Sequence, residues 1–328
     1  MTPHQGTLLT AHEVYKFYDR KGQAKRQASA VDGVSLDVRQ GESLGLVGES
    51  GSGKSTFGRM LLGLLQPTAG TISYAGIDIA SQTVAERRQA CAKRQMVFQD
   101  PISALNPRRT IAENIELPLL NFGWDREQRR QRVDELLRLV GLNPAHRNRY
   151  PHQFSGGQCQ RVVIARAIAL EPEFLFLDEP VSALDVSVQA QILNLLTDLK
   201  RNLGLTYLFV SHDLRLVRHM CDRTVVLFHG QLVEIGDSEE IYERPGHPYT
   251  RALRGAVLSV KRTAADIEVT EDDRTPNRDG RSLSAGGCRY APFCPLKMDI
   301  CTREIPRMTD LGAGHRLACH ALEKADLF

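Results

Sequence analysis

Residues 48–56 read Gly48-Glu49-Ser50-Gly51-Ser52-Gly53-Lys54-Ser55-Thr56, and this stretch decides the fold. It follows an apolar run at residues 44–47 and precedes a helix-like run at residues 57–65. In a glycine-rich loop between a strand and a helix, backbone N–H groups turn inward and the helix N-terminus adds positive potential, so phosphate oxygens bind there. The context therefore predicts a phosphate-binding loop in an α/β protein.

The polar side chains of this loop have distinct expected roles. Lys54 would reach the β- and γ-phosphates of a nucleotide as a point charge. Ser55 would place its hydroxyl on Mg²⁺, and Thr56 would approach the α-phosphate. The alternative is a glycine-rich turn that binds no nucleotide, and the complete pattern in its strand–loop–helix context disfavours it.

Length and composition limit the other functions. The chain has 328 residues, enough for one large or two modest domains with a buried core. Its net charge of +3 gives no case for nucleic acid, and the basic clusters at residues 16–26 and 126–132 are typical of solvated faces. No apolar run approaches the ~18 residues of a membrane-spanning helix, and the first residues lack the pattern of a secretory signal. We expect a cytosolic chain, or one held at a membrane only by a partner.

Strand-like and helix-like runs alternate along most of the chain. Apolar runs predict strands at residues 34–38, 43–47, 70–74, 95–98, 174–177 and 207–210. A mostly helical segment is expected at about residues 100–170, including helices at 128–140 and 159–170, and a further helix at 188–203 would end at Gly204. This alternation predicts a mostly parallel sheet covered by helices on both faces.

Polar residues follow three of the predicted strands. Asp178 would hold Mg²⁺ through water, and Glu179, which points elsewhere, could polarise an attacking water. Gln99 offers an oxygen to Mg²⁺ and the water, and His212 could meet the γ-phosphate. Each residue alone has an ordinary structural explanation, such as a helix cap or a surface position. Together they suit phosphoryl transfer, which depends mostly on positioning and charge neutralisation.

Residues 154–158, Phe154-Ser155-Gly156-Gly157-Gln158, form a second glycine-rich helix start. An ordinary serine-capped helix is the simpler explanation for this segment alone. A second helix N-terminus is also a second anion site, and one nucleotide cannot easily use both from one subunit. The simplest solution is a dimer in which these residues close on the γ-phosphate held by the loop of the partner.

These motifs together resemble the nucleotide-binding subunit of ATP-binding-cassette (ABC) transporters over about residues 8–255. The matches, in chain order, are Walker A at 48–56, the Q-loop at Gln99, the signature at 154–158, Walker B with its glutamate at 174–179, and the switch His212. The signature begins with Phe154 where leucine is commoner, but its serine and both glycines are intact. The resemblance implies a P-loop ATPase whose parallel core carries an antiparallel β subdomain and a helical subdomain.

The resemblance also implies a role for each site residue. The ATP-binding set is Tyr18, Gly48, Glu49, Ser50, Gly51, Ser52, Gly53, Lys54, Ser55 and Thr56. The catalytic set is Lys54, Gln99, Glu179 and His212, and the magnesium set is Ser55, Gln99 and Asp178. Ser155, Gly156, Gly157 and Gln158 would meet the partner's nucleotide, and Asp185 in the D-loop would contact the partner subunit. Tyr18, rather than Tyr15, matches the aromatic that stacks on adenine.

The segment Pro245-Gly246-His247-Pro248-Tyr249 looks like the His-Pro-Tyr signature of the oligopeptide, dipeptide and nickel importer branch. The closest likeness is to the second ATPase subunit of dipeptide and oligopeptide importers. That likeness implies a homologous ATPase partner in a heterodimer, two membrane permease subunits and an extracytoplasmic substrate-binding protein. It places the chain peripherally on the cytoplasmic face of the inner or plasma membrane. A nickel-chelate or other solute importer of this branch remains an alternative, because the resemblance implies that this subunit never touches the cargo.

A rival of another class is a soluble ABC ATPase that acts on nucleic acid or ribosomes. Such proteins tend to carry two cassettes or a long coiled-coil insertion, and this chain shows neither. Polar residues 256–287 predict a linker, and residues 288–328 form a small cysteine-bearing tail domain.

Four of the seven cysteines lie in that tail: Cys288, Cys294, Cys301 and Cys319. Thiolates suit zinc or an iron–sulfur cluster, but these spacings are wider than those of common zinc ribbons. The tail resembles a cysteine-rich extension of the importer branch, which implies a [4Fe-4S] cluster. Zinc and no metal at all stay open as alternatives, since such spacing specifies a site weakly.

Overall fold

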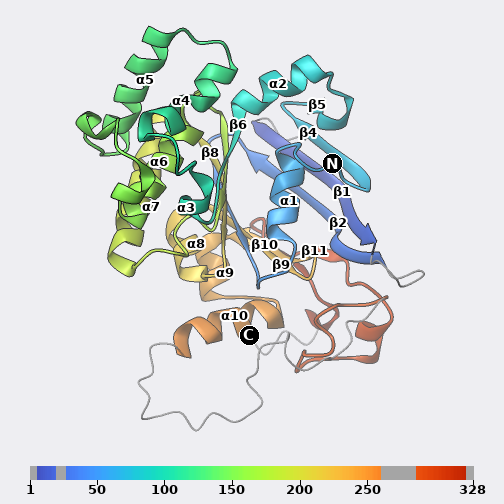
Figure 1. Ribbon diagram of the computed structural model, residues 1–328. Helices are drawn as coiled ribbons and strands as arrows, with labels where there is room; N and C mark the ends of the chain where they lie inside the picture. Colours follow the sequence, from blue (N-terminus) through green and yellow to red (C-terminus); the bar gives the residue numbers. More distant parts are fainter. Residues whose placement is uncertain (1–5, 20–26, 260–285, 323–328) are drawn as a thin grey trace.

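An eight-stranded sheet carries the phosphate-binding loop at the end of one of its inner strands (Figure 1). The computed structural model describes residues 6–19, 27–259 and 286–322. The strand order is β11-β12-β10-β9-β3-β8-β7-β6. The bounds are β3 (Ser43–Val47), β6 (Arg94–Val97), β7 (Phe174–Asp178), β8 (Thr206–Ser211), β9 (Arg223–Phe228) and β10 (Gln231–Asp237). The strands from β6 to β9 in this order pair in parallel, which confirms the predicted α/β class.

A separate antiparallel sheet, in the order β2-β1-β4-β5, lies on the other side of α1 (Lys54–Leu61) in Figure 1. Its strands are β1 (Thr7–Asp19), β2 (Gln27–Arg39), β4 (Ala69–Tyr74) and β5 (Ile77–Asp78). Buried side chains of this sheet share one core with Phe57 of α1 and with Phe174 and Phe176 of β7. Leu175 and Leu177 belong to the other core, because successive side chains of a strand point to opposite faces. Both faces of β7 are therefore buried.

The predicted helical segment forms a lobe beside β6, β7 and β8 (Figure 1). Its helices are α3 (Pro101–Ala104), α4 (Ile111–Asn121), α5 (Arg126–Leu139) and α6 (Gly156–Ala167). The other helices of the described chain are α2 (Val84–Lys93), α7 (Val186–Leu203), α8 (Leu214–Met220), α9 (Ser238–Glu243) and α10 (Pro248–Ser259). Gly204 ends α7 in the left-handed conformation, with φ +66°, as predicted. No described helix has both the length and the apolar character that crossing a bilayer requires.

Two helices begin earlier than the apolar pattern suggested. α1 begins at Lys54 rather than at residue 57, and α6 begins at Gly156 rather than at residue 159. Their first turns consist of polar residues and glycines, at residues 54–56 and 156–158, and contain no large apolar side chain. Hydrophobic periodicity cannot detect such turns.

The tail packs onto the cassette rather than forming a sheet of its own. β12 (Arg316–Ala318) pairs with β10, and β11 (Met308–Asp310) pairs with β12, so both strands extend the large sheet. The predicted linker at 256–287 begins within α10, and residues 260–285 lie outside the described chain. The tail and the loop-bearing strand thus belong to one sheet.

Candidate nucleotide site

The phosphate-binding loop joins β3 to α1 through a conformation that glycine permits. β3 is buried along its whole length, and Lys54 begins α1 directly after Gly53. Gly53 has φ +100°, and a Cβ there would lie 2.2 Å from the carbonyl oxygen of Ala30 in β2. A side chain is therefore excluded by both strain and contact. The antiparallel sheet thus packs against the loop through Ala30 of β2.

Lys54 folds back over its own loop. Its Nζ donates to the carbonyl oxygens of Gly48 and Glu49, both at 2.7 Å, and more weakly to Ser52 Oγ at 3.4 Å. Burial lowers the pKa of Lys54, while the carboxylates of Glu179 and Asp178 oppose that shift. An ammonium group has three N–H donors, so all are engaged here. A phosphate bound by Lys54 would have to replace at least one of these contacts.

Ser55 and Asp178 come together as a pair of oxygen donors. Ser55 Oγ donates to Asp178 Oδ1 at 3.0 Å, although the two residues are far apart in the sequence. Asp178 is buried, and that burial raises the pKa of its carboxyl, with the charge of Glu179 adding to the effect. A hydroxyl and a carboxylate are hard ligands that suit Mg²⁺, and a bound cation would relieve the desolvated charge. The residues present therefore fit the metal expected from the sequence.

Glu179, Gln99 and His212 meet at the ends of β7, β6 and β8. Gln99 Nε2 donates to Glu179 Oε2 at 3.2 Å, and His212 Nδ1 lies 3.5 Å from the same oxygen. Glu179 has φ +45°, a left-handed conformation that costs energy for a residue with a side chain. The structure therefore brings together three residues that the sequence placed only at separate strand ends.

The contact between Glu179 and His212 shifts the pKa values of the two side chains in opposite directions. The hydrogen bond with His212 lowers the pKa of Glu179, and the same bond raises the pKa of His212. Lys54 also lowers the pKa of Glu179 through its charge. The carboxylate is thus held in its ionised form, which can accept a proton or orient a water.

Tyr18 and Tyr15 of β1 differ in exposure. Tyr18 is 45% exposed and has Lys16 Nζ 5.5 Å from its ring centroid. Tyr15 instead stacks on Phe17, with ring centroids 6.0 Å apart, and its hydroxyl lies beside Gly33. Tyr18 therefore has a ring face available for stacking.

Ser155 caps α6 in a capping box with Gln158. Ser155 Oγ accepts from Gln158 N at 3.3 Å, and Gln158 Oε1 accepts from Ser155 N at 3.0 Å. Gly157 lies against α7, where an added Cβ would come within 2.4 Å of Val188. No hydrogen bond between the described residues joins this turn to residues 48–56. Within one chain, the turn and the loop are not brought together.

Asp185 caps α7, the helix behind α6. Its Oδ1 accepts from Val188 N at 3.1 Å and from Ser187 Oγ at 2.8 Å, and these bonds lower its pKa. Asp185 is exposed and lies about one helix turn before Val188, the residue against which Gly157 packs. Its local duty in this chain is to begin α7.

Two contacts to the loop were not foreseen from the sequence. Glu49 N donates to Tyr249 Oη at 3.0 Å, and Gly230 N donates to Ser52 O at 2.8 Å. In the sequence analysis, Tyr249 was noted only as part of a family signature. The signature marked an important residue, but nothing local indicated a partner 200 positions away.

The tail cysteines affect the pKa of Cys288, but the described residues do not form a metal-binding group. Burial raises the pKa of Cys288 to about 11, and the charges of Cys301, Cys294 and Cys319 add to this shift. Burial also raises the pKa of Cys294 and of Cys319. Among the described residues, no group of three or more His, Cys, Asp or Glu is arranged to hold a metal ion. The thiols share one neighbourhood, but their present positions do not fit a cluster.

Comparisons with known proteins show which proteins this chain resembles. A model of the ABC transporter family matches residues 31–182, and a model of the oligopeptide/dipeptide transporter C-terminal region matches residues 233–301. The oligopeptide transport ATP-binding protein AppF of Bacillus subtilis (strain 168) is 42% identical over 97% of this chain and 98% of its own. The di/tripeptide transport ATP-binding protein DppF of Pseudomonas aeruginosa (strain UCBPP-PA14) is 41% identical over 97% of this chain and 98% of its own.

Solved structures show the same likeness. A dimeric post-hydrolysis state of the ATP-binding cassette MJ0796, bound to ADP and phosphate, is 32% identical with a TM-score of 0.63. The match covers 70% of this chain and 99% of that one. The cbiO1 protein of Clostridium perfringens, part of a transporter complex, is 25% identical with a TM-score of 0.65, over 78% of this chain and 98% of that one.

Proposed function

Because this chain belongs to the ABC transporter family, with the C-terminal region of oligopeptide and dipeptide transporters, we propose that it powers the import of di- or oligopeptides. It is an ABC ATPase, which converts ATP and water to ADP and phosphate. The observation that carries the proposal is the convergence of Ser55, Asp178, Glu179, Gln99 and His212 beside the loop.

ATP would be bound by three kinds of contact. Tyr18 stacks on adenine, the N–H groups of the loop and of α1 hold the phosphates, and Lys54 exchanges a carbonyl contact for the β- and γ-phosphates. Ser55 and Asp178 would hold Mg²⁺, with Gln99 as a further oxygen donor, and the ion would neutralise phosphate charge. The pairing of Ser55 with Asp178 at 3.0 Å supports this assignment.

Hydrolysis would depend on Glu179 as the group that orients and polarises the attacking water. Its lowered pKa keeps it ionised. His212 and Gln99 now hold the carboxylate, and both would turn toward the γ-phosphate and Mg²⁺ when nucleotide binds.

The remaining contacts would come from a second ATPase subunit. The N–H groups at the start of α6 have no hydrogen bond to the loop of their own chain, and Asp185 is exposed nearby. In a dimer, Ser155, Gly156, Gly157 and Gln158 would close on the partner's γ-phosphate, with Asp185 at the seam. The dimeric state of the similar cassette MJ0796 supports this arrangement. A related but different ATPase chain is the partner that we propose.

A groove suits the membrane subunits. It has a volume of about 580 Å³ and lies between the helical lobe and β6. Leu64 and Phe98 line it and are 62% and 44% exposed, so apolar surface is available to a helix of a permease subunit. Phe98, which lines the groove, immediately precedes Gln99 of the nucleotide site. A movement of Gln99 on nucleotide binding would therefore alter the shape of the groove. The chain would thus act peripherally on the cytoplasmic face, beside two permease subunits and an external binding protein.

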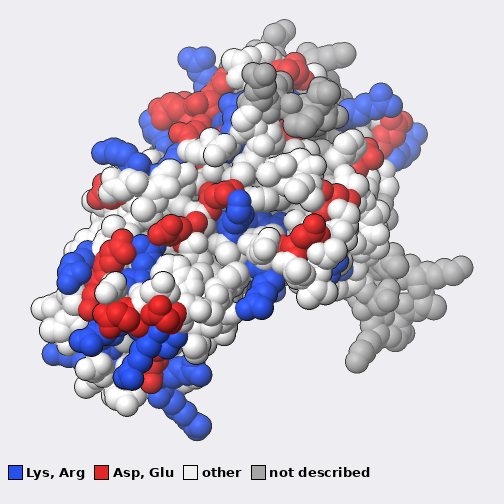
Figure 2. Space-filling view, turned by 90° about the horizontal axis from the view of Figure 1, so that it is seen from above, with Lys and Arg blue, Asp and Glu red and all other residues white. Residues whose placement is uncertain are grey.

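The surface charge favours this proposal over action on nucleic acid. Figure 2 shows Lys and Arg interspersed with Asp and Glu on the face seen from above, with no continuous basic stripe. A protein that holds a phosphate backbone usually gathers its cations on one face. The small net charge of +3 also disfavours nucleic-acid binding.

We also propose, separately from ATP hydrolysis, that the four tail thiols take up a [4Fe-4S] cluster or zinc. The charges of Cys294, Cys301 and Cys319 add to the raised pKa of Cys288, which supports this, although no described group of three or more such ligands is arranged to hold a metal ion. A metal would offset the burial that disfavours their thiolates. Anaerobic purification should give iron and sulfide, or zinc, and Cys301→Ser should lower that content; protein without any of them contradicts this assignment.

The transport proposal is tested with the assembled complex. Lys54→Ala should weaken ATP binding strongly, because the phosphates lose their buried cation; unchanged ATP affinity would contradict its role. Phe98→Ser should reduce co-purification with membrane subunits. Val84→Ser is the matched control, because Val84 is 85% exposed on α2 and does not line the groove. A chain that purifies with nucleic acid and without membrane proteins would overturn the proposal.

A further inference from the structure

We propose that the C-terminal region sets the shape of the phosphate-binding loop, with Tyr249 as its positioning residue. This inference rests on the proposed function, because it assigns a support to the same nucleotide site. Tyr249 lies in the second position of α10, within the region that matches the C-terminal family model. Its hydroxyl accepts the N–H of Glu49, at 3.0 Å, in the first turn of the loop.

This hydrogen bond holds the side of the Glu49 peptide that Lys54 does not. Lys54 Nζ binds the carbonyl oxygens of Gly48 and Glu49, whereas Tyr249 binds the Glu49 N–H. Lys54 must give up at least one contact to reach a phosphate, since its three donors are all engaged. The Tyr249 contact needs no such exchange. It is therefore the side-chain contact that can hold this peptide in both the free and the nucleotide-bound state.

Tyr249 itself has little freedom. It is 1% exposed, and its ring packs edge-on against Phe228 at 4.5 Å and beside Tyr290 of the tail at 5.4 Å between centroids. Its backbone N–H donates to His247 Nδ1 at 3.1 Å. Burial lowers the pKa of His247 to about 4, so this nitrogen is an unprotonated acceptor at neutral pH. Burial also raises the pKa of Tyr249, so the phenol stays neutral.

A second route joins the tail to the loop. Arg289 of the tail forms an ion pair with Asp32 at 2.6 Å and donates to the carbonyl oxygen of His229. The next residue, Gly230, donates its N–H to Ser52 O at 2.8 Å, inside the loop. His229 has φ +44°, so this turn between β9 and β10 is held in a strained conformation. Arg289 therefore stabilises the turn that supports the second half of the loop.

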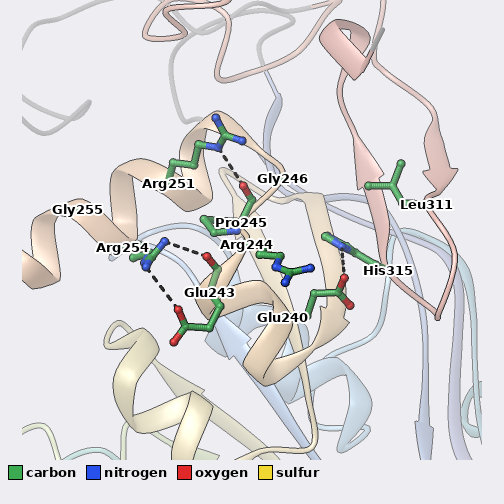
Figure 3. A pocket seen from close by; sticks show the side chains of 10 residues that line it. All are labelled: Glu240, Glu243, Arg244, Pro245, Gly246, Arg251, Arg254, Gly255, Leu311 and His315. Carbon is green, nitrogen blue, oxygen red and sulfur yellow. Dashed lines mark hydrogen bonds and ion pairs between the residues drawn. The ribbon is translucent and has the colours of Figure 1, made fainter. Parts of the chain in front are cut away.

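The tail is also fixed on its far side, so it can act as a rigid support. Buried Glu234 of β10 accepts from the N–H groups of Gly246 and His247 and pairs with His315 at 2.8 Å. His315 also approaches Glu240 of α9, at 3.6 Å, and both side chains line a cavity of about 780 Å³ (Figure 3). The segment that leads into Tyr249 is thus anchored by the same carboxylate that anchors the tail.

The test compares two phenylalanine variants of the full chain, purified with its ATPase partner. Tyr249→Phe keeps the ring but removes the acceptor of the partly buried Glu49 N–H, and about tenfold weaker binding of a fluorescent ATP analogue is expected. The KM for ATP should rise in parallel, with kcat changed less than about twofold, because Glu179 and His212 are untouched. Amide hydrogen exchange at residues 48–52 should accelerate in the nucleotide-free protein. Tyr290→Phe is the control, since its ring lies in the same cluster but its hydroxyl makes no hydrogen bond to Glu49.

The outcomes separate this inference from the function on which it rests. Wild-type binding and exchange in Tyr249→Phe would overturn it, as would equal losses in both variants, which would show only a packing role. If Tyr249→Phe does not fold, Arg289→Lys is the second variant, because it loses the fork that holds Asp32 and His229. A rise of two- to fivefold in the KM for ATP is expected, and no rise would overturn the inference. Lys54→Ala is measured alongside: if it also binds ATP normally, the nucleotide site itself is wrong.

Discussion

The Glu179 carboxylate is held by Gln99 and His212, and it is the group with the most specific assigned role. Glu179→Gln should leave ATP affinity within about twofold of wild type, because the loop contacts remain. Turnover should fall by at least ~100-fold, the usual loss when a general base is removed. Steady-state phosphate release and equilibrium ATP binding measure the two effects.

Glu173→Gln is the matched control for that substitution. Glu173 lies next to the opposite end of β7, where it accepts from Tyr74 at 2.6 Å and from Lys93 at 2.7 Å. Its loss should leave turnover near wild type. Equal turnover in the Glu179 and Glu173 variants would show that Glu179 is not the base.

At this scale, the sequence predicted residues better than contacts. Asp178, Glu179 and His212 could be placed because carboxyl ends of parallel strands meet at one sheet edge. The Gln99–Glu179 hydrogen bond could not, because it depends on a side-chain rotamer that no pattern encodes. The Tyr249–Glu49 contact depends on how α10 packs beside β9, which is a property of the folded chain.

Among the elements, the start of α6 lies close against α7. Gly157→Ala should lower the free energy of unfolding by ~1–3 kcal/mol, because its Cβ would meet the stiff side chain of Val188 at 2.4 Å. Gly156→Ala is the control, since its Cβ would lie 3.5 Å from Leu184, an ordinary contact. Urea unfolding of both variants measures the difference. Equal stabilities would contradict the close packing.

The tail strands depend on an ion pair whose strength varies with pH. The hydrogen bond to Glu234 raises the pKa of His315, and Glu240 adds to the shift. A raised folded pKa means that the stabilisation is fully present below the unfolded value of ~6.5 and is lost as pH rises through the folded pKa. His315→Gln should therefore cost ~1–3 kcal/mol at pH 6 and progressively less at higher pH. Urea unfolding from pH 6 to pH 9 measures this, and identical pH slopes for both proteins would contradict it.

The sequence located several buried strands but not all of them, since it predicted no strand at β1, β9 or β10, although β9 is a buried apolar run. The buried strands β3, β7 and β8 were predicted nearly to the residue, because continuous apolar runs mark strands buried on both faces. β11 and β12 were missed, since each has three residues and β11 is exposed throughout. They belong to the large sheet because β12 pairs with β10 and β11 pairs with β12. A segment of three residues is too short for its sequence pattern to predict such pairing.

For the whole molecule, the proposed dimer makes two sites that each need both chains. Ser155→Arg should leave ATP binding by its own loop unchanged, because no hydrogen bond joins that residue to residues 48–56 among the described residues. It should abolish ATP-driven association with the partner ATPase, since a bulky cation replaces a small acceptor at the seam. Sedimentation with and without ATP and Mg²⁺ measures association. Normal association in this variant would contradict the shared site.

The pairing of β12 with β10 has a consequence for how the chain is synthesised. Until residues 316–318 leave the ribosome, β10 presents an unpaired edge of buried, apolar character. Such edges invite pairing with other chains, so messages that stop between α10 and β12 should yield products that precipitate or are degraded. Quality control in the cell would thereby remove polypeptides that carry a complete nucleotide motif but lack its support.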